Sequence, residues 1–379
     1  MTDLTARPAL LAADVIAPAA ELWRRFAGAC AGRLPARPEV APTPAELVAV
    51  VAEAEELGLL DCGPDGLGLW SRPHDPGAVG LTLEALAALG RVRAAAAWHL
   101  HQLALGRLLC RELGLDGAHH PLAILHTGHP LAHRGLAAVL AGPARDEAGY
   151  DEVLPPVGAE GAWLVQVTEP WDALLVPRGG GEAGAVAWQL LPRAALQLDD
   201  LGPGHGLDGL VLAQACVTGG VAPARSPTAA PGVETLALAL GVTVLARVAV
   251  SVGALRRALT VALDYARTRR QGGARIIEYP AVQQLLGEAL GVAATAEAAL
   301  RGAVAPQSRH DLATLVGLAA TLLPRLCDAG NAALQSMGGI GYMRDAGVEG
   351  AVRDLNHLRV LGGAPEGLRV LALRLHEAS

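Results

Sequence analysis

A long apolar stretch in the second half of the chain constrains the fold more than any other feature. From Glu234 to Arg269 apolar residues recur at three- and four-residue spacing, which predicts one helix of about 36 residues. As one helix it is roughly 54 Å long, so it needs packing partners along its whole length. Its small residues are Ala246, Ala249, Gly253, Ala258 and Ala262. They predict close approach by a neighbour, and we expect part of this surface to meet another subunit.

Helical periodicity also fills the first third of the chain and the rest of the last third. The segments that carry it are 14–30, 43–59 and 81–113, and then 279–303, 309–337, 344–360 and 365–377. Thr43, followed by Pro44 and by Glu46 three residues on, is a good helix start. Hydrophobic residues make up 52% of the chain with only one Phe, so Leu, Val and Ala must build the core, which favours closely packed helices.

Between residues 122 and 228 the pattern changes to short apolar runs separated by Gly, Pro and Asp. The runs at 135–143, 162–167, 172–177, 185–192 and 207–213 predict strands of a small sheet or barrel. We therefore expect an α+β multidomain chain with an N-terminal helical domain (1–121), a middle β domain (122–228) and a C-terminal helical bundle (229–379).

Charge and cysteine content narrow the class of protein. A net charge of −7 gives no reason to expect a nucleic-acid or anionic-membrane partner. Five scattered cysteines without C-x-x-C spacing argue against a disulfide framework or a zinc site. The first residues do not form a convincing secretory signal, and no uninterrupted apolar run is long enough to span a membrane. We expect a cytoplasmic protein.

Four motifs follow one another in the last third of the chain. They are Tyr265-Ala266-x-x-Arg269-x-Gln271-x-Gly273, Tyr279-Pro280-Ala281-Val282-Gln283, Gln335-x-x-Gly338-Gly339-x-Gly341-Tyr342 and Arg353-Asp354. In order and spacing they resemble the C-terminal signature of the acyl-CoA dehydrogenase family. The resemblance implies a helical domain, a middle β domain and a C-terminal four-helix bundle over nearly the whole chain.

The resemblance also implies an FAD site. Its residues would be Arg269, Gln271, Gly273, Gln335, Gly338 and Gly339. In the family these motifs contact the pyrophosphate and adenosine of an FAD that lies mainly on the neighbouring subunit. A guanidinium can hold a phosphate with two hydrogen bonds, and glycines let backbone N–H groups come close. The alternative is that Arg269 and Arg270 are a solvated helix end and that Gly338-Gly339 only turns the chain.

The catalytic base of the family is not recognisable. In most members a Glu in a Tyr-Glu-Gly-Thr pattern removes the α-proton of the acyl thioester, and the matching residue is Gly362. A minority carry the Glu near the start of the long helix, where this chain has Thr243. Loss of general-base catalysis typically costs about 10²- to 10⁴-fold in rate. Glu366 and His357 are nearby titratable residues, for which a helix-start role and a packing role are the favoured interpretations.

The family's middle-domain flavin motif, Thr-Glu-Pro-x-x-Gly-Ser-Asp, is also missing. Thr168-Glu169-Pro170 is followed by Trp171-Asp172-Ala173-Leu174-Leu175-Val176, which resembles a later strand of the family, so the triplet is out of register. At the expected place, residues 136–153 contain no Ser-Asp. We therefore expect a degraded flavin site on this chain's own side.

Three functions fit these observations. The first is an FAD-dependent acyl-CoA dehydrogenase that oxidises an acyl thioester between its α and β carbons and passes electrons to an electron-transfer flavoprotein. The second is a catalytically silent subunit that completes the FAD site of an active paralogue in a dimer or tetramer. The third is a flavin-dependent monooxygenase, which would need polar groups such as His99 and His101, although two residues apart on a helix they point about 200° apart.

A metal site is not expected. The remaining histidine-rich stretch, with His119, His120, His126, His129 and His133, has no Asp, Glu or Cys framework beside it.

Overall fold

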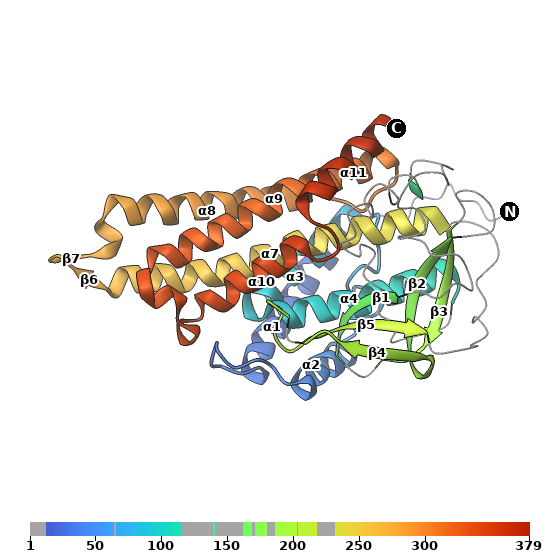
Figure 1. Ribbon diagram of the computed structural model, residues 1–379, viewed down its shortest axis with the longest axis horizontal. Coiled ribbons are helices and arrows are strands. Elements are labelled where there is room, and N and C mark those ends of the chain that lie inside the picture. The colour runs from blue at the N-terminus through green and yellow to red at the C-terminus, as the bar shows by residue number, and fades with distance from the viewer. Residues whose placement is uncertain are drawn as a thin grey trace.

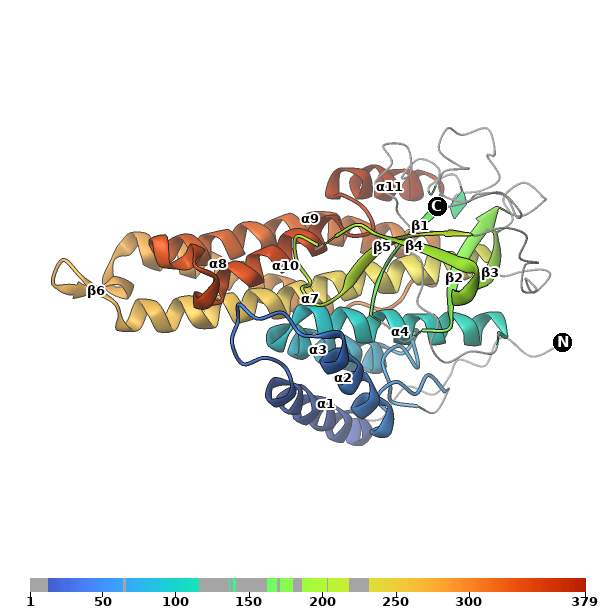
Figure 2. The same cartoon turned by 60° about the horizontal axis from the view of Figure 1, so that its bottom comes forward.

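The structure, a computed structural model, describes residues 13–63, 66–115, 136, 139–140, 162–168, 171–179, 186–202, 204–217 and 232–379. Helices come first, then short strands, then a bundle of long helices (Figure 1). The predicted fold class is therefore confirmed. The elements lie along one long axis, with the strands toward one end of the bundle and a thin hairpin at the other (Figures 1 and 2).

Four helices form the described N-terminal part. They are α1 (Ala13–Arg33), α2 (Pro44–Glu56), α3 (Pro76–Val92) and α4 (Ala94–Leu113). At the start of α2 the Thr43 hydroxyl accepts from the Glu46 amide, and the Glu46 carboxylate accepts from the Thr43 amide at 2.7 Å, so the predicted helix start is confirmed. The apolar stretch 81–113 is divided between α3 and α4 because Arg93 has an extended backbone, φ −158° and ψ 114°.

The described strands between α4 and α7 form two small antiparallel sheets. β1 (Ala162–Val167), β5 (Val211–Val217) and β4 (Leu196–Asp200) make one, and β2 (Ala173–Gly179) pairs with β3 (Val186–Pro192) in the other. Trp163, Val165 and Leu174 belong to a small core of their own between these strands.

One predicted strand is helical where it is described, and another begins later than predicted. Within 135–143 the described residues Leu136, Val139 and Leu140 are helical and buried, and their spacing of three and four is the helical signal that the prediction overlooked. In 207–213 the strand begins only at Val211, because Leu207 and Gly209 have positive φ values of 57° and 99°.

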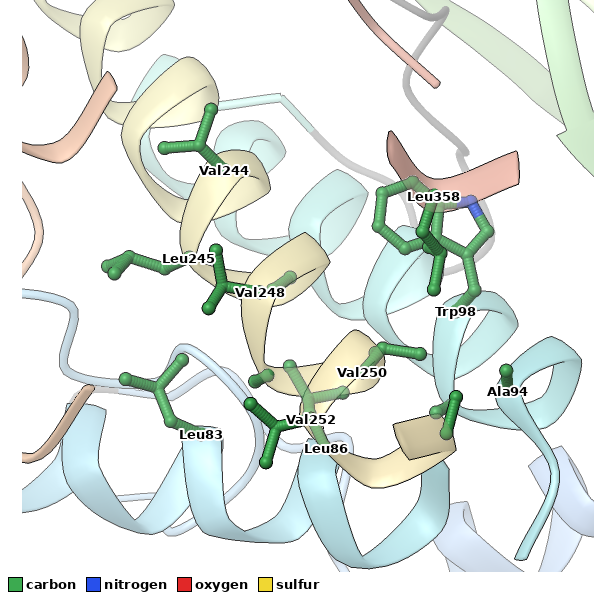
Figure 3. Close-up of a cluster of buried hydrophobic side chains, with 14 of the residues drawn as sticks. Leu83, Leu86, Ala94, Trp98, Val244, Leu245, Val248, Val250, Val252 and Leu358 are labelled. Carbon is green, nitrogen blue, oxygen red and sulfur yellow. The ribbon is translucent and has the colours of Figure 1, made fainter. Parts of the chain in front are cut away.

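The centre of the molecule is α7 (Gly232–Thr268), a helix of 37 residues that matches the predicted long helix. Gly253, one of its small residues, packs against α3 of the same chain: a Cβ there would lie 2.2 Å from the Ala87 carbonyl oxygen. Ala246, Ala249, Ala258 and Ala262 are fully buried within the chain as well. The close approach predicted at these small residues is therefore made within the chain itself, and a subunit contact elsewhere on this helix stays a prediction. Figure 3 shows part of the core that results, with side chains from α3, α4 and α7 packed together.

The bundle is completed by α8 (Pro280–Arg301), α9 (Arg309–Ser336), α10 (Val348–Val360) and α11 (Pro365–Glu377). α7 and α9 are long and apolar enough to cross a membrane by length and composition alone. The most apolar windows of α7 and α9 are, respectively, 89% and 61% buried inside the fold, as expected of core helices.

Candidate functional site

The first predicted motif forms the hairpin that extends beyond the end of α7 (Figure 1). Its strands are β6 (Arg270–Gln271) and β7 (Ala274–Arg275), joined through Gly272 and Gly273, which have φ values of 57° and 88°. Two consecutive residues with positive φ make the turn that joins twisted strands, and glycine adopts it without strain. Tyr279 fixes the hairpin by donating its hydroxyl to the Gln271 carbonyl oxygen at 2.6 Å. Arg269, Gln271 and Gly273 are exposed.

The second predicted motif lies where α9 ends. Gly338 has a φ of 62° and begins η3 (Gly338–Tyr342), and the Gln335 side chain accepts from the Tyr342 hydroxyl at 3.3 Å. Gln335, Gly338 and Gly339 are exposed. Nothing lies within 4 Å of where a Cβ would stand on either glycine, so the backbone is open to an approaching group.

The structure keeps each motif as one local unit at the hairpin end of the bundle (Figures 1 and 2). Within the described part of the chain, no hydrogen bond joins the hairpin to the glycine turn. Both present their polar groups outward, to solvent or to another molecule. Their FAD-binding role remains a prediction.

The family's base position lies in the turn between α10 and α11. Gly362 and Gly363 have φ values of 70° and 131°, so this turn has a backbone that side chains rarely adopt. A buried guanidinium from α7 holds the turn. Arg247 donates from Nε to the Leu358 carbonyl oxygen at 3.0 Å and from Nη2 to those of Arg359 and Gly363 at 2.8 and 3.0 Å.

Arg247 is fully buried, and its Nη1 has no hydrogen-bond partner. Burial lowers the pKa of its guanidinium to about 9. None of the described acidic residues forms an ion pair with it, so three carbonyls and no carboxylate face this charge. Sequence reasoning missed Arg247, although it is the single charged residue between Glu234 and Arg256. A lone Arg within the most apolar helix is a signal that could have found it.

Neither Thr243 nor Glu366 places a carboxylate in this turn. Thr243 uses its hydroxyl to bond the Ala239 carbonyl oxygen one turn back, at 2.6 Å. The Glu366 side chain is 76% exposed and lies 3.9 Å from Arg369 on the surface of α11. This placement agrees with the interpretation of Glu366 as a helix-start residue.

His357 of α10 is buried and reaches the β domain. Its Nε2 lies 3.2 Å from Gln166 Oε1 on β1, while the Gln166 Nε2 has no partner. Burial, together with His205 nearby, lowers the pKa of the His357 imidazole to about 4. The ring is therefore neutral near pH 7, and it couples the last helical bundle to the first strand.

Buried polar groups also cluster on α4. Trp70 donates from its indole N–H to His101 Nδ1 at 3.0 Å, and Trp98 packs against the same imidazole with ring centroids 4.9 Å apart. Trp70 has a φ of 60°, which is rare for so bulky a residue and costs strain energy. Desolvation lowers the pKa of His101 to about 3 and that of His99 to about 4, so both rings are neutral. His99 and His101 do not share a partner.

The fourth motif joins α10 to the segment before β5. Arg353 forms two hydrogen bonds with the Asp208 carboxylate, at 2.8 and 2.9 Å, and one with Glu349 at 2.7 Å. Asp354 accepts from the Leu207 amide at 2.7 Å. These bonds fix the C-terminal bundle against the β domain. They give the Arg-Asp pair a structural role in this chain.

A pocket of about 420 Å³ lies apart from these residues, between α1, α3, α7 and α8. Its walls are mainly apolar, with Gly80, Leu81, Val252 and Leu300 among them. Its Glu297 is already bound through two 2.7 Å hydrogen bonds to Arg256. None of the predicted site residues lines it, and the described residues contain no cluster suited to a metal ion.

Comparison with known proteins identifies this fold. Residues 231–374 match the family model of the acyl-CoA dehydrogenase C-terminal domain. The search of curated proteins found no match. The chain therefore has the acyl-CoA dehydrogenase fold, and its C-terminal helical domain belongs to the acyl-CoA dehydrogenase family.

Solved structures agree with this assignment along the whole chain. Butyryl-CoA dehydrogenase from Megasphaera elsdenii is 12% identical with a TM-score of 0.66, covering 96% of this chain and 98% of its own. The flavoprotein nitroalkane oxidase is 16% identical with a TM-score of 0.72, covering 98% and 96%. PigA, in a structure with FAD and proline, is 15% identical with a TM-score of 0.71, covering 98% of this chain and 99% of its own. Identities this low establish a shared fold and leave the activity open.

The described residues fit FAD as the cofactor that this fold implies. The open glycine turn and the exposed Arg269 suit a pyrophosphate. The unpaired Gln166 amide suits a carbonyl oxygen of the flavin ring. The predicted loss of the middle-domain motif concerns residues 136–153, almost all outside the described part of the chain. The histidines between His119 and His133 lie outside it as well.

Proposed function

We propose that this protein is an FAD-dependent oxidoreductase that acts on an acyl thioester or a related carbonyl compound without a carboxylate base in the α10–α11 turn. The observation that carries the proposal is the position of Arg247, whose Nη2 bonds the carbonyl oxygen of Gly363, next to the base position at Gly362. A buried cation in this place favours electron-rich oxygen atoms in a ligand over a second positive charge.

Different residues of the chain would bind different parts of the cofactor. Arg269, Gln335 and Gly338 would hold phosphate groups of an FAD on the neighbouring subunit, since their groups are exposed and point away from this chain's core. Gln166 would hold the flavin ring on this chain's own side, through its unpaired amide. When bound, FAD supplies a two-electron acceptor. An electron-transfer flavoprotein is the partner that would accept these electrons.

The missing base restricts the substrate. An ordinary acyl thioester has a weakly acidic α-proton, whose removal needs a positioned base. We find no described carboxylate facing the turn at Gly362, and the neutral His357 is held by Gln166. The site therefore suits a compound whose C–H bond is already acidified by a second electron-withdrawing group.

A second function is favoured by the exposure of the hairpin and the glycine turn. A subunit that lacked its own activity could still use Arg269 and Gln335 to complete the FAD site of a paralogue. Such a subunit would need no base. The two functions differ in whether the isolated chain retains flavin.

The experiment that separates them is an absorbance spectrum of the purified chain, before and after FAD is added in excess and removed by desalting. Flavin bands retained near one per chain would support a self-sufficient flavoprotein. A colourless chain that binds flavin only when it is co-purified with a paralogue would support the silent-subunit function and would overturn the first.

A further inference from the structure

Unpaired hydrogen-bond donors gather where α4, α7, α10 and β1 meet. Four of the buried atoms without partners are Arg247 Nη1, Trp98 Nε1, His101 Nε2 and Gln166 Nε2. Because His101 Nδ1 accepts from Trp70 and the ring is neutral, the proton of His101 is on Nε2, which makes that atom a donor. All four side chains are at most 5% exposed.

The four donors belong to one neighbourhood. Trp98 and His101 are packed ring against ring on α4. Trp98 belongs to the same buried cluster as Leu358 of α10, drawn in Figure 3, and Arg247 bonds the Leu358 carbonyl oxygen. The next residue, His357, bonds Gln166 of β1. In addition, α4 contacts both α10 and β1.

The balance of donors and acceptors here is uneven. Besides these four donors, the described residues of α4, α7 and α10 leave unpaired one further donor, Arg359 Nε, and one certain acceptor, Gln102 Oε1. His99 Nδ1 and Ser251 Oγ are unpaired as well and can take either role. A buried polar group without a partner costs free energy, and a buried charge without a partner costs more. The strained backbone of Trp70, which orients His101, is a cost that a binding site can explain.

We propose that the donors of Arg247, Trp98 and His101 form a binding site for an oxyanion of the substrate, beside the Gln166 amide assigned to the flavin. The substrate is a thioester or carbonyl compound with a second acceptor group, such as a 3-oxo group or a nitro group, beside the reacting carbon. The inference rests on the proposed function and names the substrate class of that same site. A charged guanidinium and two neutral N–H donors, held in a dry environment, stabilise an enolate or nitronate oxygen over its neutral parent.

The test uses acetoacetyl-CoA as the probe, because its 3-oxo group enolises and the enolate absorbs in the near ultraviolet. Butyryl-CoA, which lacks the 3-oxo group, is the matched control ligand. Both are titrated into the whole protein with and without FAD, by calorimetry and by following the enolate band, so that binding is measured even where no flavin is retained.

Three variants remove donors one at a time. Trp98→Phe keeps a ring and removes the indole N–H. His101→Asn keeps an acceptor for Trp70 and removes the Nε2 donor. Arg247→Met removes the charge, and the two α4 variants keep the test valid if that protein does not fold. Trp23→Phe, which changes a buried Trp of α1 against Phe26, is the control.

We expect the unmodified protein to bind acetoacetyl-CoA more tightly than butyryl-CoA and to raise its enolate fraction. Each donor variant should weaken acetoacetyl-CoA binding about tenfold and reduce the enolate band, as loss of a buried hydrogen bond predicts, while butyryl-CoA binding changes little. Equal affinity for acetoacetyl-CoA in all variants would mean that buried water satisfies these donors and would overturn the inference. So would absence of acetoacetyl-CoA binding to a chain that retains flavin. Loss of flavin alone would overturn only the proposed function.

Discussion

Arg247 Nη2 lies 3.0 Å from the carbonyl oxygen of Gly363, one residue past the position at which this fold usually carries its catalytic base. A single guanidinium from the central helix thereby determines the shape of the α10–α11 turn. The same contact places a buried positive charge beside Gly362, the residue that matches the family's base position.

Replacing Arg247 should loosen this turn. Arg247→Met leaves three carbonyl oxygens without their donor in a buried place, and we expect the free energy of unfolding to fall by about 3 kcal/mol. Urea unfolding measures the change. Arg325→Met, which changes an Arg of α9 with no resolved ion pair among the described residues, should alter stability much less. An Arg247→Met protein as stable as the original would contradict the role assigned to the guanidinium.

Restoring the family's acid should not restore its reaction. Gly362→Glu puts a side chain on a residue with a φ of 70°, which costs roughly 1–2 kcal/mol. The nearby Arg247 would also hold the new carboxylate ionised and lower its pKa, which makes it a weaker base. We therefore expect no turnover of butyryl-CoA with an artificial electron acceptor. Turnover by the Gly362→Glu variant at a rate well above the original would show that only the acid is missing.

Replacing Arg269 in the hairpin should weaken FAD binding and leave the free energy of unfolding unchanged. Arg269→Ala removes an exposed cation from the candidate phosphate site, and we expect FAD affinity to fall by about tenfold or more, as loss of a charge-assisted hydrogen bond predicts. Fluorescence titration of FAD measures the affinity. Arg267→Ala is the matched control, since Arg267 lies two residues away and pairs with Asp264 at 3.1 Å. An equal loss of FAD affinity in both variants would mean that the effect comes from net charge alone.

The parts of the fold and of the candidate site that depend on residues close together in the sequence could be predicted, and those that depend on distant residues could not. Helix α7 and the Thr43 start of α2 follow from local spacing and local hydrogen bonds, so the sequence predicts them well. The hairpin and the glycine turn were found through residues at fixed offsets. The bond between His357 and Gln166 joins residues 191 positions apart, and no local pattern encodes it. The close packing of Gly253 on Ala87 of α3 joins residues far apart in the chain as well, so the spacing of small residues predicted a close approach without naming the neighbour.

The contact between α10 and the β domain, made by Arg353 with Asp208 and by Asp354 with Leu207, can be tested by replacing Arg353. Arg353→Gln breaks the two hydrogen bonds with Asp208, both partly buried, and we expect a loss of about 1–3 kcal/mol and faster hydrogen exchange at the Leu207 amide. Glu366→Gln serves as the control, because its ion pair is exposed and should contribute less than about 1 kcal/mol. If exchange at the Leu207 amide stayed slow in Arg353→Gln, the contact between α10 and the β domain would depend on the Asp354 hydrogen bond alone.

Acid should destabilise the protein through its buried histidines. Burial lowers the folded-state pKa of His357 and His99 to about 4 and of His101 to about 3, against an ordinary value of 6.5. Between these values the unfolded chain binds protons that the folded chain does not, so stability falls as pH drops from 6.5 toward 4, by about 1.4 kcal/mol per pH unit for each histidine at most.

Asp354 has the opposite effect on stability, because burial raises the pKa of its carboxyl above 3.8. The folded chain therefore binds this proton more readily than the unfolded chain, which offsets part of the loss of stability caused by the histidines at low pH. Urea unfolding at a series of pH values measures the slope, and His101→Asn should reduce it by about one histidine's share. The His101→Asn variant would keep the full slope if His101 titrated equally in both states. That result would also remove the argument for a proton on its Nε2, because a ring that charges freely near pH 6.5 cannot be the neutral, desolvated donor inferred beside Trp98.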